Sequence, residues 1–397
     1  MFADIKLLPP DPILGLTKAY QEDPRTKKID LGVGVFRTLD GRTPVMKAVS
    51  QAQASVDAGE KTKSYTAGEG AAGFAPAILN LVFGADSDIE KSGRAAVVQA
   101  PGGSGSLMLA GGVLKRAGAQ GISIGDPTWP NHKPLLSAAG VEISMIPYYD
   151  HASASIDFEA FHAAVKELGP KDVLLLHGGC HNPTGSDLTK AQIDTLADTA
   201  LDRGFLPLID FAYHGFATDL ESDAYMVREF ARRLPEVLIT YSCSKNFGLY
   251  RERTGAFIAV GPDADRANAV KSHAINVART SYSLPPAHGG LIVAEILNSP
   301  ELSKMWRDEL TEMCATVRGN RRLIVETAEK IGLGNRLSFI QSQNGMFSLM
   351  PITPDEVKAI IEKHGVYMTS AGRINLCGVN ANNVEHLVSA YRDVTGA

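Results

Sequence analysis

Short apolar runs alternate with amphipathic stretches through the middle of the chain. The apolar runs, rich in Val, Ile and Leu, predict strands, and the amphipathic stretches between them predict helices. Strands that alternate with helices indicate a mostly parallel sheet covered on both faces, so the pattern predicts an α/β fold. In such a fold a ligand binds at the carboxyl ends of the strands. The strands are expected at 96–99, 122–124, 173–176 and 206–209, and the helices at 106–117 and 188–203.

The pattern changes toward both ends of the chain. From about Pro300 onward helices dominate, and the stretch 302–332 predicts a helix long enough to bridge two domains. The tail returns as a small α+β unit. We therefore expect three parts: an N-terminal arm and small-domain segment at 1–45, a large domain at 46–305, and a small C-terminal domain at 306–397.

The composition agrees with a soluble globular protein. With 397 residues, 44% of them hydrophobic, the chain is long enough for about two domains. A formal net charge of −5 argues against nucleic acid or an anionic membrane surface as the main partner. The apolar runs are too short to cross a bilayer, and the N-terminus lacks the core of a signal peptide. Four scattered cysteines without metal-ligand spacing suit free thiols in a reducing cytosol, so we expect a cytoplasmic protein without a metal.

The most informative segment is 242–248, in which Lys245 follows the apolar run 237–241. A lysine at the point where a buried strand meets a polar loop is partly desolvated, which can lower its pKa by up to about 3 to 5 and make it a nucleophile. Such an amine can form a Schiff base with an aldehyde. Ser242 and Arg253 flank it with a hydroxyl and a guanidinium, which are groups that bind phosphate. Together these residues predict a phosphorylated aldehyde cofactor, of which pyridoxal phosphate is the common one.

The spacing of Ser242 and Lys245 has a second interpretation. A Ser-x-x-Lys motif is also the signature of serine acyl enzymes such as class A β-lactamases. That interpretation needs partner motifs, and no Ser-Asp-Asn triplet occurs in the chain. The triplet 253–255, Arg-Thr-Gly, follows too closely to form a separate strand opposite the serine. The acyl-enzyme interpretation is therefore disfavoured.

Other predicted strands also end in groups with binding chemistry. The first is followed by the glycine-rich turn 101–105 at a helix start, where backbone N–H groups and the helix dipole bind phosphate. The turn lacks the third glycine of a dinucleotide-binding fingerprint. The next strand is followed by Trp129, whose flat ring could stack on a pyridine ring or simply pack in the core.

Asn182 and Asp210 follow the two remaining strands. An acidic residue at the end of an apolar strand needs a cationic or hydrogen-bonding partner, and a protonated pyridine nitrogen is such a partner. Tyr213 and Asn182 could both donate to the phenolic oxygen of the same ring. Asp210 could instead cap a helix or bind a metal, but no second carboxylate or spaced histidine cluster accompanies it.

These segments carry a family resemblance. From about Asp11 to the C-terminus the chain resembles the class I, fold type I aminotransferases, in the branch that acts on aspartate and aromatic amino acids. The resemblance implies a seven-stranded, mostly parallel sheet between helices in a large pyridoxal-phosphate-binding domain, together with a smaller α+β domain. The matching motifs lie, in the same order, at 128–132, 181–185, 210–216 and 242–248.

The resemblance implies a role for each matching residue. Lys245 would bind the cofactor covalently and, once displaced, move the proton between the substrate Cα and the cofactor. Asp210 would pair with the pyridine nitrogen, with His132 behind it, and Trp129 would stack on the ring. Asn182 and Tyr213 would bind the ring oxygen, and Gly103, Ser104, Ser242 and Arg253 the phosphate, joined by Tyr65 of the partner subunit. Arg373 would bind the substrate α-carboxylate, Gly34 would close over the substrate, and Trp129 and Asn182 would line its site.

The same resemblance implies a homodimer with shared active sites and a preference for certain substrates. Arg279 matches an arginine that reaches across the dimer to the distal carboxylate of aspartate, glutamate or 2-oxoglutarate. Leu284 stands where aspartate-specific members usually carry Asn, and Ser104 replaces a more usual Thr. Phe36 in place of the common Tyr also favours an apolar pocket. We therefore expect amino transfer between 2-oxo acids and both dicarboxylic and aromatic amino acids, by a ping-pong mechanism.

Two other classes of protein remain open. A fold type I lyase or decarboxylase acting on an acidic amino acid would share Lys245 and Asp210. It need not retain both Arg279 and Arg373, whose joint presence favours transamination. A non-enzymatic binding module is disfavoured, because a strand-end carboxylate and a desolvated lysine cost stability without a reaction to justify them.

Overall fold

The structure is a computed structural model that describes residues 2, 4–8 and 12–396. Asp11, where the family resemblance begins, lies outside these residues. The chain divides into a larger unit, Pro44–Asn182 with Ser186–Ala315, and a smaller unit, Met1–Thr43 with Pro183–Gly185 and Thr316–Ala397. The long helix α13 (Pro300–Lys330) continues from the larger unit into the smaller one. The predicted boundaries after residues 45 and 305 stay a prediction.

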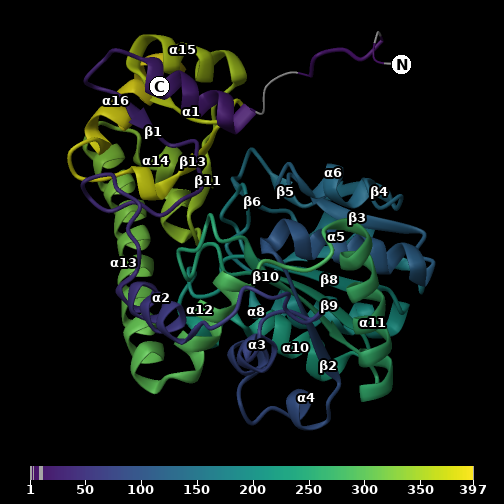
Figure 1. The fold of residues 1–397 in the computed structure, drawn as a ribbon. Coiled ribbons are helices and arrows are strands. Elements are labelled where there is room, and N and C mark those ends of the chain that lie inside the picture. Colours follow the sequence, from purple (N-terminus) through teal and green to yellow (C-terminus); the bar gives the residue numbers. More distant parts are fainter. Residues whose placement is uncertain (1, 3, 9–11, 397) are drawn as a thin grey trace. The chain divides into compact units, whose positions relative to one another are not determined.

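The larger unit is built on a seven-stranded sheet in the order β2-β10-β9-β8-β7-β3-β4 (Figure 1). Only β10 runs antiparallel to its neighbours, and the other strands run parallel to one another. The predicted α/β fold with a mostly parallel seven-stranded sheet is confirmed. The strands are β2 (Ala95–Pro101), β3 (Gly121–Asp126), β4 (Glu142–Pro147), β7 (Asp172–His177), β8 (Leu206–Phe211), β9 (Val237–Ser242) and β10 (Thr254–Val260), and β5 (Tyr149–Asp150) pairs separately with β6 (Ser155–Ile156).

Helices cover both faces of this sheet. In β7, Val173 and Leu175 belong to one core cluster with apolar residues of α5 and α11, whereas the equally buried Leu174 alternates onto the other face. Figure 1 shows α5 and α11 beside each other along the sheet. The helices of this unit are α2 (Lys47–Gly59), α3 (Phe74–Phe83), α4 (Asp88–Lys91), α5 (Gly102–Ala117), α6 (His132–Ser137), α7 (Phe158–Val165), α8 (Lys190–Arg203), α9 (Leu220–Asp223), α10 (Tyr225–Arg233), α11 (Ala264–Ser281) and α12 (Ala287–Asn298).

The predicted elements are present, with bounds shifted by a few residues. Strand β8 continues to Phe211, so Asp210 lies within the strand rather than just after it. Helix α5 already begins at Gly102, so the predicted glycine-rich turn forms its first helical turn. Strand β10 was not predicted, because its glycine and alanines have low strand propensity. Pairing with two neighbouring strands compensates for this low propensity.

The smaller unit combines short strands with helices. Strand β1 pairs in parallel with β12, and β11 pairs antiparallel with β13. The prediction of an N-terminal arm and small-domain segment at 1–45 did not include helix α1, which is followed by the short strand β1. The elements are α1 (Pro12–Glu22), β1 (Ile29–Asp30), α14 (Gly334–Leu337), the 3₁₀ turn η1 (Ser338–Ser342), β11 (Phe347–Leu349), α15 (Pro354–His364), β12 (Val366–Tyr367), β13 (Arg373–Asn375), the 3₁₀ turn η2 (Leu376–Gly378) and α16 (Val384–Thr395).

Residues 2, 4–8 and 12–396 contain neither a membrane-spanning helix nor a cluster of metal-binding side chains. None of the helices there is long and apolar enough to cross a bilayer. No group of three or more His, Cys, Asp or Glu side chains in these residues could hold a metal ion.

Candidate active site

A cavity of about 160 Å³ lies at the carboxyl ends of the parallel strands of the larger unit. The residues that follow β2, β3, β7, β8 and β9 converge on it, and Arg253 enters just before the antiparallel β10. The position of this cavity agrees with the general rule for open parallel sheets. The structure thus brings together the predicted cofactor residues of this unit except Tyr65. The lining consists of Gly103, Ser104, Leu107, Trp129, His177, Asn182, Asp210, Ala212, Tyr213, Ser242, Ser244, Lys245 and Arg253.

One wall of the cavity can bind an anion. The first turn of α5 contains Gly103 and Ser104, has no acidic residue, and presents the backbone N–H groups of a helix start. Arg253 has a left-handed backbone conformation, φ 52°, which is unfavourable for a residue with a side chain and is often retained at functional sites. A Cβ atom at Gly102 would lie 2.6 Å from Arg253 Nη2, so the glycine allows the guanidinium to lie against the helix start.

Lys245 lies immediately after β9, whose residues are all buried. Its side chain is half-buried, as predicted, and its Nζ lies 4.8 Å from the centre of the Tyr250 ring. Lys245 is thus partly shielded from water and lines the cavity.

Asp210 is 8% exposed and faces the same cavity. Burial opposes its ionisation, but His132 Nε2 lies 3.0 Å from Oδ2 and the Thr240 hydroxyl donates to Oδ1 at 3.2 Å. These partners hold the pKa of Asp210 below its ordinary value. The predicted contact between His132 and Asp210 is present, and the carboxylate is available to pair with a cation in the cavity.

A polar chain continues behind His132. The Thr128 hydroxyl lies 2.7 Å from His132 Nδ1 and 3.1 Å from His177 Nε2. Burial, with a smaller contribution from the neighbouring His132, lowers the pKa of His177 to about 3, so this imidazole is neutral at physiological pH. His177 was not among the predicted site residues. The clue in the sequence was its position at the end of a predicted strand. In the structure, the register of β7 on β8 pairs His177 with Asp210.

Two further predicted residues meet at the cavity. The Asn182 side-chain amide donates to the Tyr213 hydroxyl at 3.4 Å, and both residues are buried. Trp129 is half-buried and packs edge-to-face on His132, with ring centres 5.3 Å apart. The Asn–Tyr pair and the indole therefore line one space together with Asp210.

Tyr65 and Arg279 belong to the larger unit but do not line this cavity. Tyr65 is 91% exposed and lines a separate cavity of about 330 Å³ together with Ser283 and Leu284. Arg279 is exposed at the end of α11 and donates to the Ser283 hydroxyl at 2.5 Å. Within one chain, then, these predicted residues form a second group at the surface.

Gly34 and Arg373 belong to the smaller unit. Arg373 is 4% exposed, its Nη2 donates to the Gly32 carbonyl oxygen at 2.6 Å, and its guanidinium lies 4.3 Å from the centre of the Phe347 ring. A Cβ atom at Gly34 would lie 2.8 Å from Cζ of the same ring. The two predicted substrate residues of this unit therefore both pack against Phe347.

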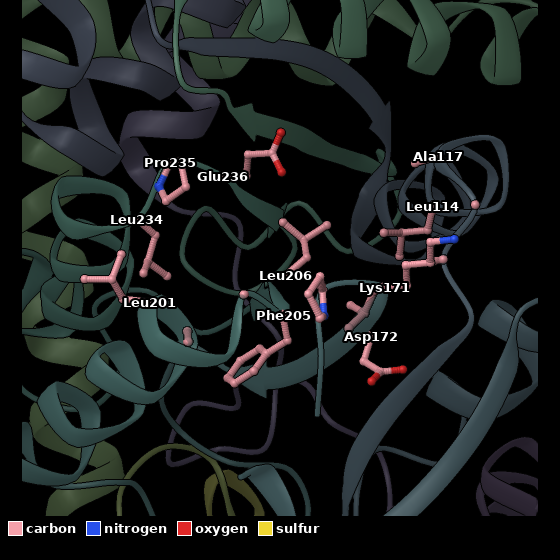
Figure 2. Close-up of a pocket in the computed structure, with 16 residues that line it drawn as sticks. Leu114, Ala117, Lys171, Asp172, Leu201, Phe205, Leu206, Leu234, Pro235 and Glu236 are labelled. Carbon is pink, nitrogen blue, oxygen red and sulfur yellow. The ribbon is translucent and has the colours of Figure 1, made fainter. Parts of the chain in front are cut away.

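Another cavity, of about 220 Å³, opens at the opposite edge of the sheet, near the amino ends of β3, β7, β8 and β9. Figure 2 shows the carboxylates of Asp172 and Glu236 well separated, with Phe205 and Leu206 between them in this view. Its charged groups do not converge on one point, and it contains none of the predicted site residues.

The cavity beside Lys245 fits a phosphorylated aldehyde with a basic ring nitrogen. The guanidinium, hydroxyl and N–H groups of one wall suit a phosphate, the lysine amine suits the aldehyde, and the ionised Asp210 suits the protonated ring nitrogen. The fold and this donor set define a fold type I enzyme that uses pyridoxal phosphate.

Comparison with known proteins identifies the family. The family described as "Aminotransferase class I and II" matches residues 26–390. The chain is 43% identical to the aromatic-amino-acid aminotransferase of Pseudomonas aeruginosa and 42% identical to the aspartate aminotransferase of Salmonella typhi. The alignments cover 99% and 98% of this chain, and 98% and 99% of those proteins, respectively. The crystal structure of an aromatic-amino-acid aminotransferase from Burkholderia pseudomallei, covalently bound to pyridoxal phosphate, matches with a TM-score of 0.96 and 38% identity over 99% of both chains.

The chain belongs to the class I and II aminotransferase family. The predictions of an aminotransferase, and of pyridoxal phosphate as its cofactor, are confirmed. The roles assigned to individual residues stay predictions.

Proposed function

We propose that this aminotransferase moves the amino group between 2-oxo acids such as 2-oxoglutarate and two kinds of L-amino acid, dicarboxylic and aromatic. The observation that carries the proposal is the convergence of Lys245 and a buried, ionised Asp210 on one cavity with an anion-binding wall. The names of the similar proteins, aromatic-amino-acid and aspartate aminotransferases, support both kinds of substrate.

When bound, the cofactor supplies an aldehyde carbon for amine exchange and a ring that accepts an electron pair from the substrate. Arg253, Ser242 and the start of α5 hold its phosphate. Asp210, kept ionised by His132, holds the proton on its ring nitrogen. Trp129, Asn182 and Tyr213 line the same cavity. Trp129 would stack on the cofactor ring, and Asn182 and Tyr213 would bind its oxygen.

Lys245 Nζ acts as the base of the reaction. Lys245 would hold the cofactor through its amine and, when that amine is free in the cavity, would take the proton from the substrate Cα. The same amine would return the proton at the end of the transfer. Lys245 is half-buried at the wall of the cavity, and this position limits the access of water to its amine.

Carboxylate recognition falls to two arginines. Arg373 binds the α-carboxylate that all substrates share, and Gly34 closes over the substrate. Arg279 binds the distal carboxylate of aspartate, glutamate and 2-oxoglutarate, and Leu284 in the same exposed group gives an aromatic side chain an apolar contact.

We further propose a cytoplasmic homodimer in which Tyr65 and Arg279 of each chain complete the site of the other. Their exposure, and their separation from the cofactor cavity of their own chain, support this assignment.

The absorption spectrum tests the reaction. The purified protein should show a visible band from the lysine-bound cofactor, and aspartate should abolish this band without release of carbon dioxide. Release of carbon dioxide would indicate a decarboxylase, and a colourless protein with no response to added pyridoxal phosphate would refute the assignment.

Mixed dimers test the shared site. A Lys245→Ala chain and an Arg279→Asp chain, unfolded and refolded together, should form about half mixed dimers, each with one intact site of two. Aspartate activity should then recover to about a quarter of the wild-type value, whereas each variant refolded alone stays inactive. Mixed dimers of confirmed size without recovery would place Arg279 in the site of its own Lys245.

A further inference from the structure

One ion pair closes a backbone loop in the smaller unit. Asp30 is the last residue of β1, and its carboxylate, only 3% exposed, pairs with Arg37, whose side chain is 19% exposed. Arg37 binds Asp30 twice, because Nη2 reaches the carboxylate and Nη1 donates to the backbone carbonyl oxygen at 3.0 Å. A single guanidinium thus joins the two ends of the loop 30–37.

This loop is attached to the predicted α-carboxylate-binding residue. Asp30 Oδ1 accepts a hydrogen bond from the Gly32 backbone N–H at 2.9 Å, and Arg373 Nη2 donates to the Gly32 carbonyl oxygen at 2.6 Å. Gly32 therefore hydrogen-bonds to the buried Asp30 carboxylate through its N–H and to the buried Arg373 guanidinium through its carbonyl oxygen.

Strand β13 also holds the middle of the loop. The Asn375 side-chain amide donates to the carbonyl oxygens of Val33 at 2.6 Å and of Val35 at 2.8 Å. These two residues flank Gly34, so the backbone on both sides of the predicted closing residue is anchored to the strand that carries Arg373.

The charge of Asp30 makes Arg37 necessary. A buried carboxylate without a cation is strongly unfavourable and draws on any cation within reach. With Arg37 in place the carboxylate is neutralised, and Arg373 keeps its capacity for a substrate carboxylate. Without Arg37, the cation next linked to Asp30 is Arg373, because both residues hydrogen-bond to Gly32.

We propose that Asp30 and Arg37 are a positioning pair for the α-carboxylate subsite, holding the loop 30–37 in place and keeping Arg373 available to substrate. The inference rests on the proposed function of Arg373. It concerns a step common to all substrates, because every amino acid and 2-oxo acid carries the α-carboxylate.

The test is steady-state kinetics of the holoenzyme with aspartate, phenylalanine and 2-oxoglutarate. Arg37→Met should raise KM at least about tenfold for all three substrates, as small displacements of a binding group do, and change kcat by less than about threefold. The double variant Asp30→Asn/Arg37→Met should recover most of the loss, because it removes the unpaired charge. Arg37→Lys, which keeps the charge, should raise KM by only about threefold.

The matched control is Arg25→Met. Arg25 pairs with Asp23, another buried carboxylate of the same unit, and also donates to the Ile361 and Glu362 carbonyl oxygens. Neither residue of this pair has a described hydrogen bond to Gly32 itself; Asp23 instead accepts a hydrogen bond from the Tyr367 hydroxyl at 2.8 Å. Its loss should lower thermal stability to a similar extent but leave KM within about twofold of wild type.

Equal KM values for Arg37→Met and Arg25→Met would overturn the inference, as would a rise in KM that persists undiminished in the double variant. If Arg37→Met does not accumulate as holoenzyme, the KM values of Arg37→Lys and Arg25→Lys are compared instead, and equal values would again overturn the inference. Arg373→Ala distinguishes the proposed function of Arg373 from the proposed positioning role of Asp30 and Arg37. Unchanged KM in that variant would refute the proposed function of Arg373 itself, whereas a raised KM there with no effect at Arg37 refutes only the positioning pair.

Discussion

Buried His214 makes the stability of the larger unit depend on pH. The side chain is fully buried, its Nε2 lies 2.7 Å from the Leu220 carbonyl oxygen, and its Nδ1 lies 3.0 Å from the Tyr241 hydroxyl. The carbonyl oxygen can only accept, so Nε2 carries the proton of the neutral ring. Burial, with a contribution from the charge of Arg228, lowers the pKa of His214 from 6.5 to about 4, although the Leu220 carbonyl opposes this.

The sign of the effect follows from proton uptake. Below pH 6.5 the unfolded chain binds a proton at His214, and the folded chain does not bind it until about pH 4. Acid therefore favours unfolding. The stability contributed by neutral His214 is complete above pH 6.5 and is lost as the pH falls toward 4. The interval of about 2.5 pH units corresponds to at most about 3.4 kcal/mol, with a slope of about 1.4 kcal/mol per pH unit.

The assay is urea unfolding followed between pH 7.5 and 4.5, for wild type and His214→Gln. The variant should lose some stability at pH 7.5 and should show a shallower dependence on pH, by up to about one proton. His177 and His181 remain in both proteins, so their contributions cancel in the comparison. His273→Gln removes an exposed histidine and is the control. Parallel pH profiles for wild type and His214→Gln would refute the argument that His214 is held neutral by burial.

Three other predictions concern the site. Lys245→Ala should still bind pyridoxal phosphate but retain less than about a thousandth of wild-type turnover in an aspartate transamination assay, because no other predicted group replaces its amine. Arg279→Ala should slow aspartate far more than phenylalanine, since only the dicarboxylate loses a charge-assisted contact worth about 1.5 to 3 kcal/mol; equal slowing in kcat/KM would make its role structural. Gly255→Ala should weaken cofactor retention during dialysis, because its Cβ would lie 2.6 Å from backbone atoms of Gly102 and Tyr241 and displace the start of α5. Gly319→Ala is the control and should leave cofactor retention unchanged, because no atom lies within 4 Å of the new Cβ.

Much of the candidate site could be predicted because it follows from local patterns. The apolar runs that form β7, β8 and β9 end at residues close to Asn182, Asp210 and Lys245. Parallel strands place their carboxyl ends at one edge, so these side chains had to lie near one another once the fold class was known. The residue types then limited the chemistry, since a desolvated lysine beside phosphate-binding groups suits few cofactors.

The tertiary structure decided which groups are partners. The register of β7 on β8 places His177 opposite Asp210, and that of β8 on β9 places Thr240 beside it. Strand order and register depend on packing between distant segments, which hydrophobic periodicity does not encode. The antiparallel β10 likewise brings Arg253 to the carboxyl edge from its own amino end.

The smaller unit illustrates the same division. The resemblance of the sequence to a known family made Arg373 a candidate for binding the substrate α-carboxylate. Only the folded chain joins Arg373 to Gly32 and closes the loop between Asp30 and Arg37, since β13 and that loop are separated by more than three hundred residues. A contact across such a separation depends on how the whole unit folds, because each segment alone lacks the buried surroundings that make the charges pair.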